Sequence, residues 1–295
     1  MPNDDIPAPR SLTMPTPTGP RLAGPMESMA KWPWWLLLAT LGALYFTFLI
    51  ITDDQTQRTF WFISGQSPEG LRNGQIAFKG ITITLTVAVG AYLMSSLIGL
   101  TFGLMRSSSN PILFNIASLY VELTRGIPML VLLLYVAFAL TPLVVQSLAG
   151  LGVPITTRDV PGEVRAMIAL AIGYGAFSAE IFRAGIQSVE RGQIEAARAL
   201  GMGYFKTMRL VVLPQAVRRI LPALGNDFIS MVKDSSLVAI LGVQDLTQLT
   251  RLYYSGNFLY MQSLTMLAFI YLLLVVILTR LVRLMEARLQ RAYAR

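Results

Sequence analysis

Long apolar runs, separated by short polar stretches, occupy most of the chain. An α-helix needs about 20 mainly apolar residues to cross a bilayer, because it rises about 1.5 Å per residue. Runs of this kind recur along the sequence, so we predict an all-α integral membrane protein with six transmembrane helices. The expected spans lie in residues 33–52, 80–105, 127–145, 165–189, 216–243 and 262–284.

The remaining segments are polar or mixed. Residues 1–29 are rich in Pro, Gly, Ser and Thr and have little to bury, so we predict a disordered tail. Residues 111–125 mix apolar and polar side chains and predict an amphipathic helix at the membrane interface, ended by Gly126 and Pro128. The stretches 53–79, 146–164 and 244–261 are expected to be connections, and 286–295 a basic tail.

Composition supports the membrane class and excludes several kinds of site. The 295 residues are 54% hydrophobic and 14% charged, whereas soluble domains have about 25% charged residues. Cysteine and histidine are absent, so we expect no disulfide, no ordinary zinc site and no histidine base. We therefore predict no metal in this chain.

The net charge of +8 indicates an orientation. Lysine and arginine concentrate in the cytoplasmic loops of membrane proteins. With the N-terminus inside, the inner loops hold far more of these residues than the outer loops, where they stand beside acidic residues. We therefore predict that both termini are cytoplasmic. Nucleic-acid binding is disfavoured, because no separate soluble domain carries the charge.

One insert, residues 193–214, belongs to neither a span nor an ordinary loop. Its first part, residues 195–200, consists of strong helix formers, and Gly201 and Gly203 permit a positive φ. A second short helix follows, which Pro214 can end. The pattern predicts a helix, a glycine elbow and a second helix on the cytoplasmic side. A helix resting on lipid headgroups and a docking element for a partner both remain open.

Several motifs carry a resemblance to a known family. Glu195-Ala196-Ala197, Gly201 and Leu213-Pro214 resemble the EAA loop of ABC importer permeases. Over residues 80–284 the chain is similar to the polar amino acid permeases, which take up histidine, arginine, glutamine and glutamate. It departs from that pattern at Phe177, Ala184, Ile194 and Asp227. The resemblance implies that ATPase coupling uses Glu195, Ala196, Ala197, Gly201, Met202, Gly203, Leu213 and Pro214.

The resemblance also implies an assembly in a prokaryotic inner membrane. Residues 80–285 would form the permease domain, and residues 30–79 an extra N-terminal span with an external loop. A second permease subunit, the same or homologous, two ATPase subunits and an external substrate-binding protein would complete an amino acid importer. ATP and Mg²⁺ would bind the ATPase partner, and no cofactor is expected here. In agreement, the sequence lacks a G-x-x-x-x-G-K-[ST] phosphate loop.

Charged residues inside a predicted span are costly and usually functional. Asp227 and Asp234 lie seven residues apart and share a helix face, whereas Lys233 lies elsewhere on it. A zwitterionic amino acid needs a cation for its carboxylate and an anion for its ammonium group. Pairing of Lys233 with an acid, to hold the bundle together, is the alternative. The candidate substrate path comprises Asp227, Lys233, Asp234, Ser235, Ser236, Glu180, Tyr174 and Phe177.

Two further patterns predict packing. Glu122/Arg125 and Glu180/Arg183 each place an acid three residues before an arginine, which predicts a structural ion pair at a helix end. Residues 99–103 form a G-x-x-x-G pattern that permits close helix approach.

Other functions remain possible on the sequence alone. They are a permease for another small polar solute, an intramembrane hydrolase using Lys233 with Ser235 or Ser236, and a membrane scaffold. Neither the particular amino acid nor the choice between a homodimer and a heterodimer follows from the sequence.

Overall fold

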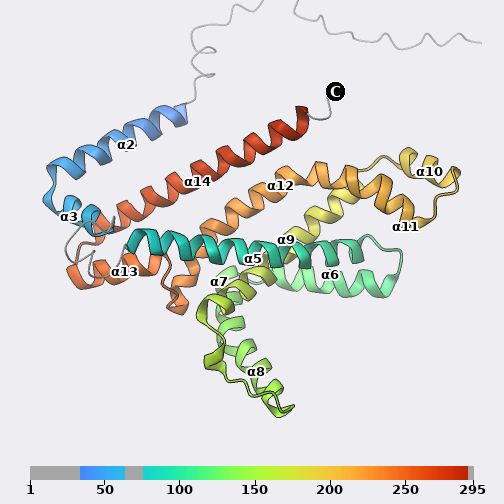
Figure 1. Ribbon diagram of the computed structural model, residues 1–295, viewed down its shortest axis with the longest axis horizontal. Coiled ribbons are helices and arrows are strands. Elements are labelled where there is room, and N and C mark those ends of the chain that lie inside the picture. The colour runs from blue at the N-terminus through green and yellow to red at the C-terminus, as the bar shows by residue number, and fades with distance from the viewer. Residues whose placement is uncertain (1–33, 64–75, 292–295) are drawn as a thin grey trace, which may run out of the picture. The chain divides into compact units, whose positions relative to one another are not determined.

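The computed structural model describes residues 34–63 and 76–291. The predicted tail 1–29 therefore lies outside the described residues, as do positions 292–295 of the basic tail. Every regular element in the described part is helical, as the all-α prediction requires (Figure 1). The chain divides into two compact units, the first ending at Leu49 and the second beginning at Ile50. Most of α2 (Trp34–Thr52) belongs to the first unit.

The second unit contains the elements that position the candidate site. Its α-helices are α3 (Asp54–Ile63), α5 (Ile76–Arg106), α6 (Pro111–Gly126), α7 (Met129–Tyr135), α8 (Thr141–Gly150), α9 (Gly162–Gln187), α10 (Arg191–Ala199), α11 (Tyr204–Thr207), α12 (Leu213–Asp234), α13 (Leu246–Asn257) and α14 (Tyr260–Arg291). Two π-helical segments, η1 (Val136–Leu140) and η3 (Met208–Val212), and two 3₁₀ segments, η2 (Thr157–Asp159) and η4 (Ser235–Leu241), connect them.

Four helical segments of the described part are long and apolar enough to cross a membrane. They are Phe78–Arg106, Met129–Gly150, Gly162–Gln187 and Tyr260–Arg288. The expected fifth span, 216–243, differs from the prediction. Its α-helix ends at Asp234, a 3₁₀ segment follows, and Gly242 turns the chain with φ 76°. Charged and amide side chains make α12 less hydrophobic than these four segments.

Two helices lie where we expected polar connections, and the helix predicted over residues 111–125 is present as α6. α3 follows α2, which is not among these four spans, and α13 begins after Asp245, whose carboxylate accepts hydrogen bonds from the Thr247 and Gln248 N–H groups at 3.2 and 2.9 Å. An aspartate three residues before a glutamine is a signature of a helix start, which the polar character of this stretch concealed. α6, the helix predicted over residues 111–125, packs against both α5 and α9.

The most extensive helix–helix contact in the second unit joins α5 to α9, which lie side by side in Figure 1. Glycines of α5 face bulky or backbone atoms of α9. A Cβ atom built on Gly103 would lie 2.7 Å from the Phe182 Cβ and 2.8 Å from the Ala179 carbonyl oxygen, and one on Gly99 would overlap Ser178. The close approach predicted from the G-x-x-x-G pattern is confirmed.

The hydrophobic core continues this contact. Buried Val87 of α5, Leu170 of α9, Met231 of α12 and Val238 of η4 belong to one cluster. α12 and η4 are therefore anchored to the α5–α9 pair by apolar packing at the end opposite the elbow.

We expect Gly103→Ala to lower the free energy of unfolding by about 1–3 kcal/mol, because the added methyl group overlaps the Phe182 side chain and α9 backbone. Thermal unfolding of the detergent-purified chain measures the effect. Gly150→Ala is the matched control, since nothing lies within 4 Å of its added Cβ. Equal unfolding temperatures for the two variants would contradict the close packing of α5 on α9.

Candidate functional site

The elbow predicted in residues 193–214 is present. α10 ends in a Schellman arrangement, in which the Gly201 N–H donates to the Arg198 carbonyl at 2.9 Å and the Met202 N–H to the Ala197 carbonyl at 3.1 Å. Gly201 has φ +77°, the left-handed conformation that glycine adopts without steric cost. The positive φ predicted at Gly201 is therefore confirmed.

Two details of the predicted elbow are wrong. Gly203 has φ −66° and precedes α11 in an extended conformation, so it does not make the turn. Pro214 does not end the second helix: α11, η3 and α12 follow one another without a break from Tyr204 to Asp234. A π turn precedes the proline: the Leu213 N–H donates to the Met208 carbonyl five residues back, and this wider turn gives room for the proline ring.

The elbow presents an apolar surface. Leu200, Phe205 and Leu210 are 83%, 74% and 62% exposed, and Tyr204 is exposed beside them. The coupling residues divide into exposed Glu195, Ala196, Gly201, Gly203 and Pro214, partly buried Met202 and Leu213, and buried Ala197. Side chains this apolar and this exposed indicate a surface that another molecule covers.

α12 holds its two aspartates against α9. The Ser178 hydroxyl donates to Asp227 at 2.9 Å, and the Tyr174 hydroxyl donates to Asp234 at 2.8 Å. Ser178 and Tyr174 lie four residues apart, so one face of α9 serves both carboxylates. The shared face predicted for Asp227 and Asp234 is confirmed, and neither carboxylate has an ion pair among the described residues.

A different face of α12 is polar and exposed. Asn226, Ser230 and Lys233 follow one another at helical spacing and are all exposed. Lys233 makes no ion pair within the described part of the chain. The aspartates point toward α9, so Lys233 lies on a different face of α12, as its spacing from Asp227 predicted.

Neither serine after Lys233 is hydrogen-bonded to it among the described residues. Ser235 is fully buried and donates its hydroxyl to the Val232 carbonyl at 2.7 Å, while Ser236 is partly buried. Lys233 lies on the exposed face and makes no hydrogen bond to either serine among the bonds of the described residues. A Ser/Lys pair requires the lysine amine within hydrogen-bond reach of the serine hydroxyl.

The two aromatic residues predicted on the path differ in exposure. Tyr174 is buried, Phe177 is 40% exposed, and their ring centroids are 6.0 Å apart. The Arg125 guanidinium lies over the Phe177 ring, 5.4 Å from its centroid. Arg125 does not form the predicted ion pair with Glu122 among the described residues, and both side chains are exposed. Stacking on Phe177 takes the guanidinium to α9 instead.

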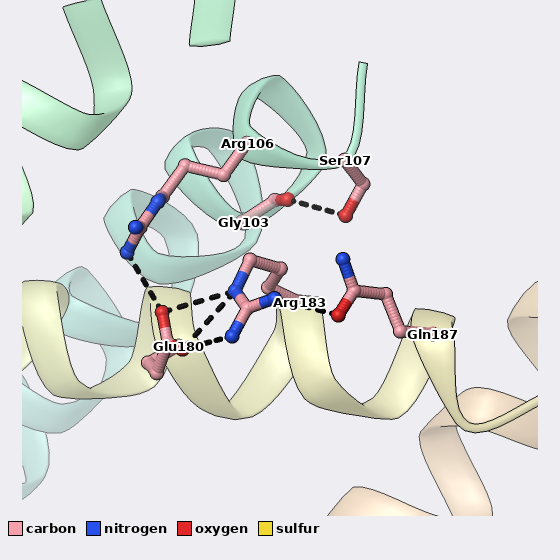
Figure 2. A network of polar contacts seen from close by, with 6 residues as sticks. All are labelled: Gly103, Arg106, Ser107, Glu180, Arg183 and Gln187. Atoms are coloured by element: carbon pink, nitrogen blue, oxygen red, sulfur yellow. Dashed lines mark hydrogen bonds and ion pairs between the residues drawn. The ribbon is translucent and has the colours of Figure 1, made fainter. Parts of the chain in front are cut away.

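Glu180 is the centre of a polar network (Figure 2). It forms the predicted ion pair with Arg183, and it also accepts a hydrogen bond at 2.7 Å from Arg106 at the end of α5. Arg183 additionally donates to Gln187 at 2.6 Å. The sequence did not predict Arg106 as a partner of Glu180, because the two residues lie 74 positions apart and local spacing cannot relate them. No group of three metal-ligating side chains occurs within the described ranges.

Glu180→Gln should lower the free energy of unfolding by about 1–3 kcal/mol, because charged hydrogen bonds to two arginines are lost. The side chains of Arg106 and Glu180 are only 15% and 30% exposed, so this pair should outweigh a surface pair. Thermal unfolding in detergent tests the change. Glu122→Gln is the control, with an exposed acid that forms no ion pair in the described part; equal losses in both variants would argue against the network.

Comparisons with known proteins cover the same region. The family described as "Binding-protein-dependent transport system inner membrane component" matches residues 95–291. The probable amino-acid permease protein YxeN of Bacillus subtilis (strain 168) is 33% identical over 215 residues, 73% of this chain and 92% of that protein. The glutamine transport system permease protein GlnP of Escherichia coli (strain K12) is 32% identical over 217 residues, 73% of this chain and 93% of that protein.

The chain is also similar to a solved structure over about the same part of its length. A chain of the structure described as "an amino acid ABC transporter with histidines" is 37% identical, has a TM-score of 0.62, and covers 74% of this chain and 96% of its own length. The family match includes Glu180, the elbow and α12, so these features belong to a transport component and the hydrolase alternative is not favoured. The chain is a member of the family of inner membrane components of binding-protein-dependent transport systems.

Proposed function

We propose that this chain is the membrane-spanning permease subunit of an ATP-driven ABC importer for amino acids. Support for the cargo comes from relatives named as amino-acid and glutamine permeases and from a neighbour described as an amino acid transporter. Support for the importer class comes from the family itself. The unbroken helix from the elbow to the polar face of α12 carries the proposal.

The elbow is proposed to receive the ATPase subunit. Its exposed apolar side chains are unfavourable in water and require a binding partner. The sequence contains no phosphate loop, so ATP must bind another subunit. Because α11, η3 and α12 follow one another without a break, with Pro222 inside α12, a displacement of the elbow is passed directly to α12. ATP and Mg²⁺ bind the partner ATPase in this proposal, and α12 transmits the resulting motion to the membrane.

The exposed polar face of α12 is proposed to line the substrate path. Asn226, Ser230 and Lys233 would be costly against hydrocarbon, so they require water or another protein surface. A second permease subunit, the same or homologous, would enclose that space. Lys233 then supplies a cation for the substrate carboxylate. Asp227 and Asp234 do not face the path in this proposal. They hold α12 on α9 through their hydrogen bonds to Ser178 and Tyr174.

The topology follows from this arrangement. The elbow and both termini lie on the cytoplasmic side of a prokaryotic inner membrane, where the basic loop residues favour them. Residues 80–285 form the permease domain, and an external binding protein delivers the amino acid from the opposite side. A permease for another small polar solute is the alternative, and titration with individual amino acids distinguishes the two.

Gly201→Val should reduce ATP-driven uptake at least tenfold in vesicles that contain the complete transporter. A β-branched residue strongly disfavours the φ of +77°, and the site is otherwise open, with nothing within 4 Å of an added Cβ. The decrease therefore reports the backbone turn and not crowding. Uptake and substrate-stimulated ATP hydrolysis are measured in the same vesicles.

Gly203→Val, which adds the same side chain, is the matched control, because its φ of −66° suits any residue and its surroundings in this chain are equally open. Normal uptake in the Gly201→Val vesicles would disprove the role of the turn. Equal losses in both variants would indicate that the loop tolerates no side chain at all, and would also contradict the proposal.

Lys233→Gln should weaken the substrate response of the assembled complex at least tenfold, because the substrate carboxylate loses the cation that this part of α12 offers it. Thermal-shift titration with individual amino acids measures the response and identifies the cargo. Lys206→Gln, an exposed lysine on the elbow, is the control. An unchanged response in Lys233→Gln would place the path elsewhere.

A further inference from the structure

A cavity of about 590 Å³ lies beside the elbow. It is bounded by the end of α9, by α10, by α11 with η3, and by the turn after α5, a region where these elements meet in Figure 1. Ile186, Ile194 and Met208 contribute apolar lining, and Ser107 and Thr207 contribute hydroxyl groups. Its lining includes Tyr204 of the elbow, but none of the eight predicted coupling residues and none of the substrate-path residues.

The charged groups of its lining are all cationic. Arg191 and Arg198 both line the cavity, and no aspartate or glutamate does. They lie seven residues apart on one face of α10, about 10 Å along the helix at 1.5 Å per residue. Among the described residues neither arginine has an ion pair or hydrogen bond, although Glu195 lies between them on the same helix.

The neutral polar lining also offers donors. Gln187 accepts the Arg183 hydrogen bond through its side-chain oxygen, which leaves its NH₂ group to donate (Figure 2). The Tyr204 hydroxyl is available in the same way. The lining therefore combines hydrogen-bond donors with an apolar wall and contains no carboxylate. Such a lining suits an anionic group that is attached to an apolar or glycerol portion of the same molecule.

We propose that this cavity binds the phosphate group of an anionic molecule, with the phosphate held between Arg191 and Arg198. Arginine binds phosphate oxygens through paired N–H donors and remains charged at all relevant pH values. The phosphate could belong to an anionic phospholipid headgroup or to a free phosphate ester. A bound phosphate joins α10 to Gln187 of α9 and thereby stabilises the elbow. This inference does not depend on the identity of the transported solute.

Native mass spectrometry of the full chain in detergent tests the proposal. The probes are phosphatidylglycerol, the zwitterionic phosphatidylcholine and soluble glycerol 3-phosphate. We expect phosphatidylglycerol to bind at least tenfold more tightly than phosphatidylcholine, and the double variant Arg191→Gln/Arg198→Gln to lose that preference. Arg209→Gln is the matched control, because Arg209 is an exposed arginine of the same loop that does not line the cavity.

The outcomes separate the two sources of phosphate. Arginine-dependent binding of phosphatidylglycerol that glycerol 3-phosphate does not displace identifies the lipid headgroup. Arginine-dependent binding of glycerol 3-phosphate itself identifies a free phosphate ester. Phosphatidylglycerol binding that survives in the double variant, or that is lost equally in Arg209→Gln, overturns the proposal. Arg191→Lys/Arg198→Lys should retain most binding, which distinguishes lost charge from a damaged fold.

Discussion

Two hydrogen bonds from α9 hydroxyls to α12 carboxylates are the interaction on which the arrangement depends. α12 is the most polar of the long helices in the second unit, and a carboxylate without a partner inside a membrane protein is expensive. Ser178 and Tyr174 satisfy Asp227 and Asp234 without neutralising them. They fix the rotation of α12 about its axis. That rotation in turn directs Asn226, Ser230 and Lys233 away from α9 and leaves them exposed.

The helix that carries these bonds is itself held firmly. Glycines of α5 bring its backbone against α9, and Arg106 at the end of α5 binds Glu180. α9 is therefore fixed to α5 both by shape and by charge. The elbow touches the bundle through a smaller buried cluster, formed by Val189, Val212 and Ala216. A firmly packed α5–α9 pair with a less tightly packed elbow fits the proposal that the elbow receives a conformational change from the ATPase subunit.

The sequence predicted the helical class, the elbow at Gly201, the shared face of the aspartates and the Glu180–Arg183 pair, because each follows from local spacing. It did not predict Arg106 as a partner of Glu180 or the stacking of Arg125 on Phe177, because both depend on which helices meet. The prediction at Pro214 was wrong for a related reason. Proline usually ends a helix, but a π turn admits the ring, and only the backbone hydrogen bonds reveal that turn.

The same combination occurs a second time, and this recurrence explains the role of the π turn. In α7 and α8 the segment Val136–Leu140 is π-helical, the Thr141 N–H donates to the Val136 carbonyl, and Pro142 follows, as Leu213 and Pro214 follow η3. In each case the carbonyl that the proline ring would strike lies inside the widened turn. The turn accommodates the proline ring within a continuing helix, whereas Pro222 lies inside α12 without such a turn. At η3 that continuity joins the elbow to the polar face of α12, and a helix ended by Pro214 would separate the two.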